Sequence, residues 1–538
     1  MEEMVEFAFA TSPAEPRSLK EAQKRDDWDL WYEAALKEYT QMLAHNTWDL
    51  VPLPKGRKPV GSKWVFKIKE NADGSIERYK ARIVAQGFSQ KPHLDYTETF
   101  APVTKFASLR TILAISAIED LELHHMDVSS AFLNGDLQED IYMVQPEGFV
   151  EPGKEHLVCH LKKSLYGLKQ SPRQWYQKLH GTFSDLGFKR CPSDNSIWVW
   201  AKDKVKVIIP VYVDDLTLAC NDLTALNELK SKLQSKFEMR DLGELKYILG
   251  LEIRRNRLNR KLWLSQHKHT LDILQRFHHE HSRPVSTPLD PSISLSKVDS
   301  MSQEEKDFMS GVPYLSAVGS LMYLAIGTRP DIAYAVGLLS RFNSCPAKVH
   351  WKAIQRVFQY LKGTLDFCLE FGSSSVGGVN LSVFSDSDYA GDTEKARSTS
   401  GYASFIGASC VNWSSRRQDV VAKSTTEAEL IAANSGASDG TWLTHLLEEL
   451  GFPQATPFPL QMDNQSSIKV AKNPEHHGKM KHLDTKYYWI RDQVDLGKLR
   501  IEWVPSSDNH ADILTKALTK DLHQQQCSLL GLKRQELD

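Results

Sequence analysis

Residues 207–220 read VIIPVYVDDLTLAC, in which two adjacent acids, Asp214 and Asp215, interrupt a run of apolar residues. Burying one carboxylate is costly, and two side by side repel each other. Apolar flanks on both sides favour strands, so the stretch predicts a tight hairpin whose turn directs both carboxylates out of the sheet toward one point. The simpler alternative is a surface hairpin with a solvated Asp-Asp turn.

A third acid stands upstream, in HHMDVSSAFLNG (residues 124–135), which places Asp127 in a short strand context. Three carboxylates that converge from two segments are unstable unless cations neutralise them. Two Mg²⁺ ions would do so, and the chemistry they suit is in-line displacement at phosphorus.

The length and composition limit the number of domains and the class of protein. A chain of 538 residues exceeds a single core and predicts two to four domains. Hydrophobic residues make up 41% and charged residues 25%, a normal globular balance. The net charge is −2, so any nucleic-acid contact must come from local basic patches and not from a global field.

The seven cysteines include no CxxC pair, which argues against a zinc ribbon or a disulfide framework and fits a reducing compartment. No apolar run approaches the length of a membrane span, and the first residues lack the pattern of a signal peptide. We expect a soluble intracellular protein with no membrane partner.

Periodicity suggests how the chain divides. Two alternating runs surround Asp73-Gly74 and predict a hairpin. Residues 281–303 are rich in Ser and Pro and form the best linker candidate. A fresh strand pattern near residue 379 predicts a second α+β domain over 376–520. Helical patterns fill 19–45, 161–190, 222–240 and 313–363.

Longer sequence segments around the acids resemble those of a known family. Tyr-Val-Asp-Asp in such a strand, with Met-Asp-Val upstream, resembles the catalytic motifs of reverse transcriptases. The surrounding words are similar to the polymerase of copia-type LTR retrotransposons, and they cover nearly the whole chain. They are WVFKIKENADGSIERYKARIVAQGF (64–88), MDVSSAFLNG (126–135), LYGLKQSPRQWY (165–176), YVDDL (212–216), VGSLMYLAIGTRPDIAYA (318–335) and RSTSGY (397–402).

The resemblance implies an α+β fold. It consists of a right-hand polymerase with fingers, palm and thumb, then a helical connection and an α/β ribonuclease H-like domain. The expected boundaries are 1–45 for an N-terminal helical extension, 46–280 for the polymerase, 281–375 for linker and connection, and 376–538 for the ribonuclease H-like domain. The chain resembles the polymerase and ribonuclease H part of a larger polyprotein.

The resemblance also assigns roles at the first acidic set. Asp127 and Asp214 match the principal metal ligands, with Asp215 as the supporting third acid. Phe132 matches the aromatic that stacks under the sugar and excludes a 2′-hydroxyl, although core packing is its simpler explanation. Gly167 matches a segment that lets the backbone approach the template base pair.

A basic hairpin supplies the local positive charge. Arg78, Lys80 and Arg82 fall on one strand face by their period of two. We hypothesise that Lys80 and Arg82 bind the incoming triphosphate. An ordinary solvated hairpin face explains any one of these residues equally well.

A second acidic set lies near the C-terminus. Asp386 and Asp463 end apolar strands, Glu429 lies in a helix, and Asp512 opens a last helix. Strand-end Asp, helix Glu, strand-end Asp and helix Asp form the four-acid pattern of ribonuclease H, which copia-type polymerases carry after the polymerase. Its chemistry again needs two metal ions, here to activate water against an RNA phosphodiester.

Each of these acids has a competitor or another explanation. Asp388 shares a strand face with Asp386, but the order Val-Phe-Ser-Asp fits the family's first strand better. Glu427 lies about 200° from Glu429 on a helix, so only one should face the site. Ser424-x-x-Glu427 forms a capping box, Thr426-x-x-Glu429 has the same spacing, and the word Ala-Glu-Leu-Ile-Ala favours Glu429.

The roles of Asp512 and of the neighbouring His510 have alternatives. Asp512 could simply be a favourable acid in a first helical turn. His510 stands too close to Asp512 to be matched with the histidine that assists many ribonucleases H. The joint occurrence of all four acids, in order, favours the functional interpretation.

The resemblance therefore predicts an RNA-directed DNA polymerase with ribonuclease H activity. It would use Mg²⁺, with Mn²⁺ as the alternative, two ions per site. Its partners would be an RNA template, a DNA primer, RNA–DNA hybrids and deoxynucleoside triphosphates, with other polyprotein products as further partners. The family implies virus-like particles in the cytoplasm, with the nucleus as the second compartment. The alternatives are an inactive or domesticated nucleic-acid-binding remnant, or a ribonuclease H alone.

Overall fold

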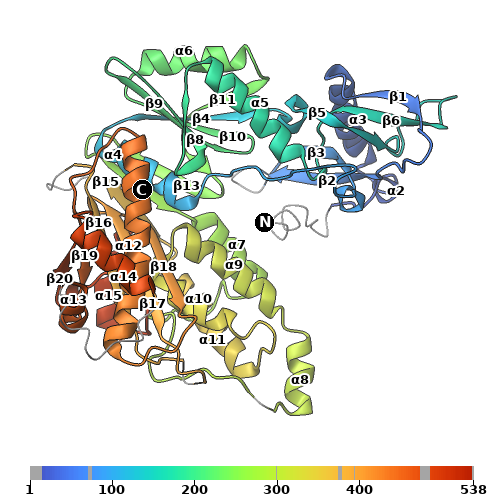
Figure 1. Cartoon of the computed structure of the whole chain (residues 1–538). Coiled ribbons are helices and arrows are strands. Elements are labelled where there is room, and N and C mark those ends of the chain that lie inside the picture. The colour runs from blue at the N-terminus through green and yellow to red at the C-terminus, as the bar shows by residue number, and fades with distance from the viewer. Residues whose placement is uncertain are drawn as a thin grey trace.

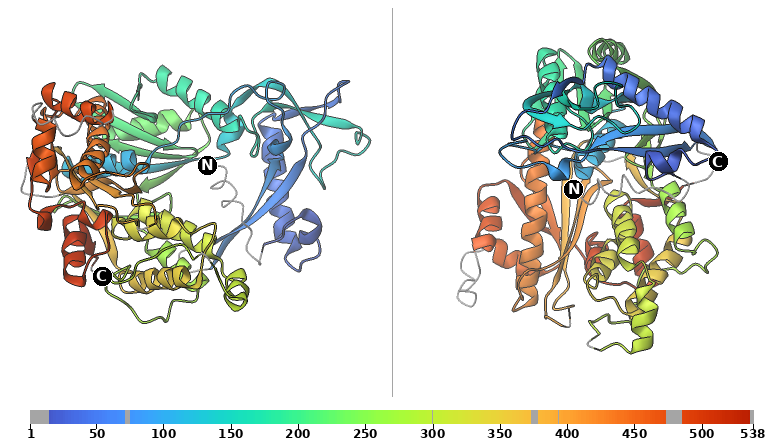
Figure 2. Two further views of the ribbon diagram at one scale, coloured as in Figure 1. Left: turned by 60° about the horizontal axis from the view of Figure 1, so that its bottom comes forward. Right: turned by 90° about the vertical axis from the view of Figure 1, so that its right-hand side faces the viewer.

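The computed structural model describes residues 15–70, 75–298, 300–372, 378–392, 394–472 and 485–535. Figures 1 and 2 show a sheet-rich part from which a long hairpin projects, and two lobes that lie side by side beneath it. One lobe consists of helices and the other is built on a mixed sheet. The structure thus confirms the expected mixture of helices and strands.

The N-terminal layer surrounds the projecting hairpin. Helix α3 (Trp28–Ala44) packs on β3, and its buried Trp31 makes edge contacts with the rings of Phe66 and Tyr79. A three-stranded sheet of order β1-β6-β5 completes this layer. The strands are β1 (Trp48–Pro52), β2 (Ser62–Glu70), β3 (Ile76–Ala85), β5 (Asp136–Met143) and β6 (Leu157–Lys163). The Asp73-Gly74 turn predicted between β2 and β3 lies outside the described residues.

A six-stranded sheet carries VIIPVYVDDLTLAC, and both of its faces are covered. Ile208 and Ala219 lie in one core with α4 (Phe106–Ile118), whereas Ile209 and Leu218 lie in another with α5 (Ser171–Asp185) and α6 (Leu223–Gln234). Alternate residues face opposite sides, so burial of both sides requires the continuous apolar run. The order is β11 (Met239–Glu244), β4 (Glu122–Val128), β10 (Asp215–Cys220), β9 (Val205–Tyr212), β8 (Asp194–Lys202) and β7 (Lys189–Cys191).

Pro210 lies in the central strand β9, away from the sheet edges where proline is usual. It pairs with Ile197 of β8. On the other side, the partners of β9 and β10 include Leu216–Val211 and Ala219–Ile208 but none for Pro210 or the preceding isoleucine. This gap in the ladder accommodates a residue that has no N–H to donate.

A second sheet joins the middle of the chain to its end. Its order is β12 (Tyr247–Ile248), β13 (Leu251–Asn256), β14 (Lys261–Ser265), β15 (Phe367–Gly372) and β21 (Leu532–Arg534). One buried cluster runs from Leu113 of α4 through Phe371 of β15 to Val383 in the C-terminal lobe. The sheet-rich part and the C-terminal lobe therefore share a continuous core.

The helical lobe has its own core. It contains α7 (His267–Arg276), α8 (Gln303–Ser310), α9 (Tyr314–Gly327), α10 (Ala333–Ser340) and α11 (Lys348–Lys362). The described residues of the predicted linker form no helix or strand before Gln303. No single helix in the described part is long and apolar enough to cross a membrane, although α8 and α9 together, bent by 56°, meet that length and composition.

The C-terminal lobe is built on a five-stranded sheet of order β18-β17-β16-β19-β20. The first three strands are antiparallel, and β16, β19 and β20 are parallel. Helix α12 crosses the sheet closely, because a side chain at Gly440 would lie 2.5 Å from the Phe458 ring. The strands are β16 (Leu381–Ser387), β17 (Thr399–Ile406), β18 (Ser409–Arg417), β19 (Phe458–Met462) and β20 (Leu499–Trp503). The helices are α12 (Thr425–Glu449), α13 (Gln465–Lys472), α14 (Thr485–Asp495) and α15 (Lys520–Leu529).

Several predicted helices have different boundaries. The helix expected over 19–45 is divided into α2 (Leu19–Ala22) and α3. The segment 161–190 begins as the end of β6, and α5 starts only at Ser171, where Pro172 fits a first helical turn. The helix expected from Asp512 is a single 3₁₀ turn, η6 (Asp512–Leu514), and α15 follows separately.

A buried ion pair connects the helical lobe internally. Arg329 and Asp331 are 3% and 2% exposed, and the guanidinium donates three hydrogen bonds to the carboxylate, the shortest at 2.7 Å. The Tyr360 hydroxyl donates a further bond to Asp331, at 2.6 Å. Burial alone would raise the pKa of Asp331, but Arg329 holds it below its usual value. The two charged residues of the segment GTRPDIAYA therefore form a buried structural ion pair.

Replacing Asp331 by Ala would leave Arg329 buried without its counter-ion. We expect the Asp331→Ala variant to lose about 3–5 kcal/mol of stability, because an uncompensated buried charge is costly. The matched control is Asp366→Ala, which breaks the exposed pair with Arg534 and should cost below about 1 kcal/mol. Urea midpoints of both variants check this, and equal shifts would contradict it.

Candidate active sites

The first acidic centre is built on the hairpin between β9 and β10. The two strands are joined by the turn Val213–Asp214, where Val213 has a φ of +58°, which β-branched residues rarely adopt. The Trp175 indole N–H donates to the Val213 carbonyl at 2.6 Å. The Val128 N–H donates to the Asp214 carbonyl at 2.9 Å. The turn is therefore fixed from two sides.

This hairpin brings two of the three predicted acids to one cavity. Asp127, in β4, and Asp214 both line a cavity of about 610 Å³. Burial, followed by the nearby charges of Asp215 and Asp127, raises the pKa of Asp214. Asp215 does not line the cavity, and its Oδ1 lies 2.7 Å from His125 Nε2. In the described part of the chain these three acids do not form a group whose oxygens all lie within 4.8 Å of one another.

The predicted phosphate-binding residues line the same cavity. Lys80 and Arg82 both contribute to its wall. Burial, followed by repulsion from Arg82 and other cations, lowers the pKa of Lys80 to about 8. The Arg82 guanidinium lies 4.4 Å from the centre of the Tyr166 ring, whose edge-on partner is Phe132 at 4.9 Å. Phe132 is half-buried and reaches the cavity through Tyr166.

Tyr166 was missed by reasoning from the sequence. Burial raises its pKa to about 12. Tyr166 directly precedes Gly167 in the segment LYGLKQSPRQWY. An aromatic residue next to that glycine was the feature of the sequence that could have indicated it. Gly167 itself has a φ of +88°, and a Cβ there would lie 2.1 Å from the Ala85 carbonyl oxygen. Packing against β3 accounts for this glycine without any bound nucleic acid.

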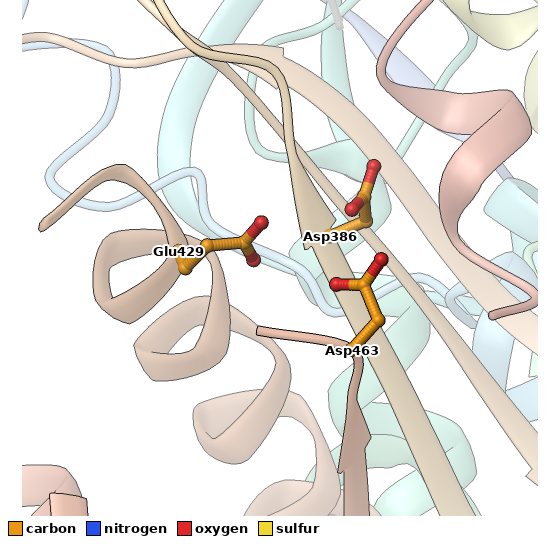
Figure 3. A group of neighbouring side chains, drawn as sticks. All are labelled: Asp386, Glu429 and Asp463. Atoms are coloured by element: carbon orange, nitrogen blue, oxygen red, sulfur yellow. The ribbon is translucent and has the colours of Figure 1, made fainter. Parts of the chain in front are cut away.

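The second acidic centre gathers three of its four predicted acids (Figure 3). Asp386 projects from the end of β16, Glu429 from the first turns of α12, and Asp463 follows β19 directly. Carboxylate oxygens of all three lie within 4.8 Å of one another. The parallel pairing of β16 with β19 brings the two aspartates to one sheet end, and α12 places the glutamate over it.

The electrostatics of this centre call for a cation. Burial raises the pKa of Asp386 to about 6. Burial, with Asp386 and Asp463 nearby, raises the pKa of Glu429 to about 9. The buried Oε2 of Glu429 has no hydrogen-bond partner among the described residues. Crowded carboxylate oxygens with an unsatisfied atom fit a divalent ion such as Mg²⁺, whose preferred ligands are oxygens.

The fourth acid is paired instead with a lysine. Asp512 forms an ion pair with Lys516 and is absent from the three-acid group. Burial would lower the pKa of Lys516, but Asp386, Asp512 and Asp463 together raise it. The sequence reasoning missed Lys516, although its spacing of four from Asp512 was visible.

Asp388 and Glu427 both have other partners. Asp388 accepts a hydrogen bond from the Thr399 N–H beyond the end of β16. Glu427 accepts one from the Lys423 N–H at 2.8 Å, and its own N–H donates to Ser424 Oγ at 3.1 Å, which closes the capping box of α12.

His510 is half-buried and packs against two aromatic rings of the C-terminal lobe. Its ring centre is 3.8 Å from that of Phe384 and 5.0 Å from that of Phe405, and burial lowers its pKa to about 4. The histidine therefore packs against these rings as a neutral side chain.

A basic cavity of about 760 Å³ lies between α4, the α9–α10 pair and β18. In the strand register Arg416 is opposite Ser400, which is opposite Ser387, the neighbour of Asp386. Two strand spacings put this end of the cavity about 10 Å from the second acidic centre. The cations that line the cavity are Lys105, Arg110, Arg341, Arg397, Arg416 and Arg417.

Binding of Mg²⁺ at the second centre should release protons. At about pH 7 Glu429 is protonated and Asp386 is mostly ionised, so we expect roughly one proton to leave when the ion binds. Because both pKa values are raised, these acids destabilise the metal-free fold as pH rises from about 4, and the loss is complete above about 6 for Asp386 and above about 9 for Glu429; the affinity for Mg²⁺ should rise over the same window.

Calorimetric titration with MgCl₂ in two buffers of different protonation enthalpy measures this release. The Glu429→Gln variant is the matched control, since it keeps the shape and has no proton to lose. An equal release by wild type and variant would contradict the assignment.

Comparisons with known proteins agree with these features. The family described as reverse transcriptase (RNA-dependent DNA polymerase) matches residues 45–291. The retrovirus-related Pol polyprotein from transposon TNT 1-94 of Nicotiana tabacum is 42% identical over 529 residues, 98% of this chain and 40% of that protein. A Ty5-1 transposon protein of Saccharomyces cerevisiae is 34% identical over 310 residues, 57% of this chain and 98% of that protein.

Among solved structures, a foamy viral protease–reverse transcriptase in complex with double-stranded DNA aligns with 93% of this chain and 73% of that chain. The TM-score is 0.23 and the identity 13%, so no conclusion about the fold is drawn from it. The identities over long segments and the match at residues 45–291 show the family: the chain belongs to the reverse transcriptases of copia-type LTR retrotransposons.

Proposed function

We propose that this chain copies RNA into DNA in the cavity of Asp127 and Asp214, and cleaves the RNA of RNA–DNA hybrids at Asp386, Glu429 and Asp463. The observation that carries the proposal is the first cavity, where two acids and the cations Lys80 and Arg82 face one space. The chain spans only 40% of the length of its tobacco relative.

At the polymerase centre the acids would hold two Mg²⁺ or Mn²⁺ ions, which activate the primer hydroxyl and neutralise the leaving pyrophosphate. Lys80 and Arg82 bind the triphosphate of the incoming deoxynucleotide. Phe132, held by Tyr166, excludes the 2′-hydroxyl of a ribonucleotide. Asp215 supports the site through its pair with His125, which fixes the start of β10.

At the nuclease centre the acids would hold two further ions, which activate water against the RNA phosphodiester. Glu429 keeps its proton until a cation displaces it, which lessens the repulsion among the acids in the metal-free centre. Lys516 holds the fourth acid, Asp512, beside the other three.

Each part of the fold is assigned to a subdomain of the proposed enzyme. We assign the β2–β3 layer to the fingers, the six-stranded sheet to the palm, and β12–β14 with α7 to the thumb. Helices α8–α11 form the connection, and the C-terminal lobe forms the ribonuclease H-like domain. The strand order β18-β17-β16-β19-β20, with helices on a mixed sheet, supports the last assignment. The partners are an RNA template, a DNA primer and deoxynucleotides, in cytoplasmic particles or the nucleus.

Two other functions compete, a domesticated nucleic-acid-binding remnant and a ribonuclease H with a structural polymerase scaffold. The chain keeps the acids of both centres together with their supporting contacts, such as Trp175 with Val213. Their joint preservation favours an active enzyme with both functions.

A first experiment separates the polymerase function from the other two. Purified protein is incubated with a primed RNA template, Mg²⁺ and deoxynucleotides, beside the Asp214→Asn variant. We expect extension by wild type, reduced below about one hundredth in the variant because a metal ligand is lost. Extension that is absent, or equal in both, would overturn the polymerase assignment.

Cleavage of a labelled RNA–DNA hybrid tests the second centre separately. We expect Asp463→Asn to lose cleavage and to retain extension, whereas Asp214→Asn should retain cleavage. Cleavage that survives Asp463→Asn would overturn the nuclease assignment.

The basic cavity supports a polyanionic substrate that passes near the nuclease centre. The double variant Arg341→Gln, Arg416→Gln should bind a hybrid duplex more weakly and reduce its salt slope by about two, since each lost phosphate contact removes about one. The control is Lys232→Gln, Lys236→Gln, which removes equal charge at or just beyond the end of α6 (Figure 1). Filter binding at several salt concentrations checks this, and equal slopes for the two double variants would contradict it.

A further inference from the structure

Arg110 is a buried cation at the place where three parts of the chain meet. It is 2% exposed and belongs to α4, within the segment that matches the reverse transcriptase family. Its guanidinium donates hydrogen bonds to the end of α9, in the helical lobe, and to β18 of the C-terminal lobe (Figure 1). A buried charge is costly, so these hydrogen bonds decide whether it is tolerated.

The end of α9 is held from two sides. Arg110 Nη1 donates to the Ile326 carbonyl at 2.7 Å and to the Gly327 carbonyl at 2.9 Å. The Trp413 indole N–H, from β18, donates to the Ala325 carbonyl at 2.8 Å. These are the last three residues of α9, whose carbonyls have no N–H partner within the helix. The helix dipole and the face of the Trp413 ring, 4.0 Å from the guanidinium carbon, both favour the cation.

A third hydrogen bond fixes an irregularity in β18. In the pairing of this strand with β17, the register passes from Cys410 to Asn412 and skips Val411. Arg110 Nε donates to the Val411 carbonyl at 2.7 Å. A bulge of this kind redirects the strand beyond it, and a slip of one residue would turn every following side chain to the other face of the sheet.

All three elements that Arg110 joins line the basic cavity. Its walls come from the start of α4, the end of α9 and the part of β18 beyond the bulge, with Phe106, Ile326 and Arg416 among the lining residues. Arg110 also lies in the wall, but it is 2% exposed and offers little surface to a phosphate. Its contacts therefore determine the shape of the cavity.

We propose that Arg110 is a positioning residue of the nuclease, which fixes the walls of the basic cavity so that their cations face one bound hybrid duplex. This inference rests on the proposed function of that cavity. It assigns a residue of the polymerase segment to the second activity. The effect passes through β18 to β17, which pairs with β16, the strand that carries Asp386.

Arg110 could instead serve only the stability of the contact between the lobes. Arg255 provides a matched control, because its buried guanidinium also donates to main-chain carbonyls, those of Leu121 and Ser116 at the other end of α4. It lines a different cavity. Arg110→Met and Arg255→Met each remove a buried guanidinium and keep an unbranched side chain, so we expect both to lower the urea midpoint.

The first test follows β18 directly. Hydrogen exchange of the amides in residues 409–417, read by mass spectrometry, reports local opening of the strand. We expect Arg110→Met to speed this exchange about tenfold, the factor that a lost hydrogen bond to a charged group is worth, and Arg255→Met to leave it within about twofold. Equal exchange in the two variants would overturn the proposal.

The second test measures filter binding of a hybrid duplex without divalent ions, so no cleavage occurs. We expect Arg110→Met to weaken binding about tenfold, because the cations of the walls must then be ordered when the duplex binds. The slope of affinity against salt should stay within about half a unit of wild type, because no phosphate contact is lost. An unchanged affinity contradicts the proposal, and a slope reduced by about one would make Arg110 a phosphate-binding residue instead.

Steady-state cleavage of the hybrid shows where the loss occurs. In Arg110→Met we expect the KM for the hybrid to rise about tenfold and kcat to stay within about twofold, because the acids of the second centre are unchanged. The KM for dTTP in primer extension should also stay within about twofold. Equal losses of extension and cleavage would mean that Arg110 serves only stability.

Trp413→Phe keeps the test decisive if Arg110→Met does not fold. It retains an aromatic ring beside the guanidinium but loses the hydrogen bond to Ala325, so we expect the same changes at about threefold. Wild-type cleavage with an unchanged hybrid KM in both variants overturns the role of Arg110 alone. Absent wild-type cleavage, with weaker duplex binding in the variants, overturns the nuclease function but retains the positioning role.

Discussion

The mutual repulsion of carboxylates that apolar elements hold together is the constraint on which both centres depend. At the second acidic centre burial, followed by this repulsion, raises the pKa of Glu429 to about 9, and at the first acidic centre the same two causes raise the pKa of Asp214. A lysine lies beside the acids of each centre. Lys516 forms an ion pair with Asp512 at the second centre, and Lys80 lines the cavity of the first. The packed strands supply the free energy that keeps like charges close, and the cations limit its cost.

Much of this arrangement could be predicted from the sequence. The acids lie at the ends of strands, and the apolar pattern of each strand can be recognised from its own residues. The hairpin of Asp214 and the sheet-end position of Asp386 both follow from such patterns. The partners of these acids could not be predicted in the same way. Tyr166 and Glu38 reach the cavity from segments far away in the chain, and periodicity contains no information about distances between segments.

The departures have physical causes as well. Asp215 pairs with His125 because Asp215 is opposite Asp127 in the register of β10 with β4, and His125 lies two residues before Asp127 on the same face of β4. Asp512 begins a single 3₁₀ turn instead of a long helix, and its carboxylate pairs with Lys516, four residues further on. Local patterns predict the type of an element better than its ends, since tertiary contacts decide where a helix stops.

The second sheet has a mechanical consequence. Because β21, the last strand described, pairs with β15, and β15 pairs with β14, the end of the chain is joined to the strands that follow the palm. The shared core leaves little room for the two carboxylate centres to move independently. Their separation is then a constant of the fold, and under the proposed function it would set the number of base pairs between the newest nucleotide and the cut in the template.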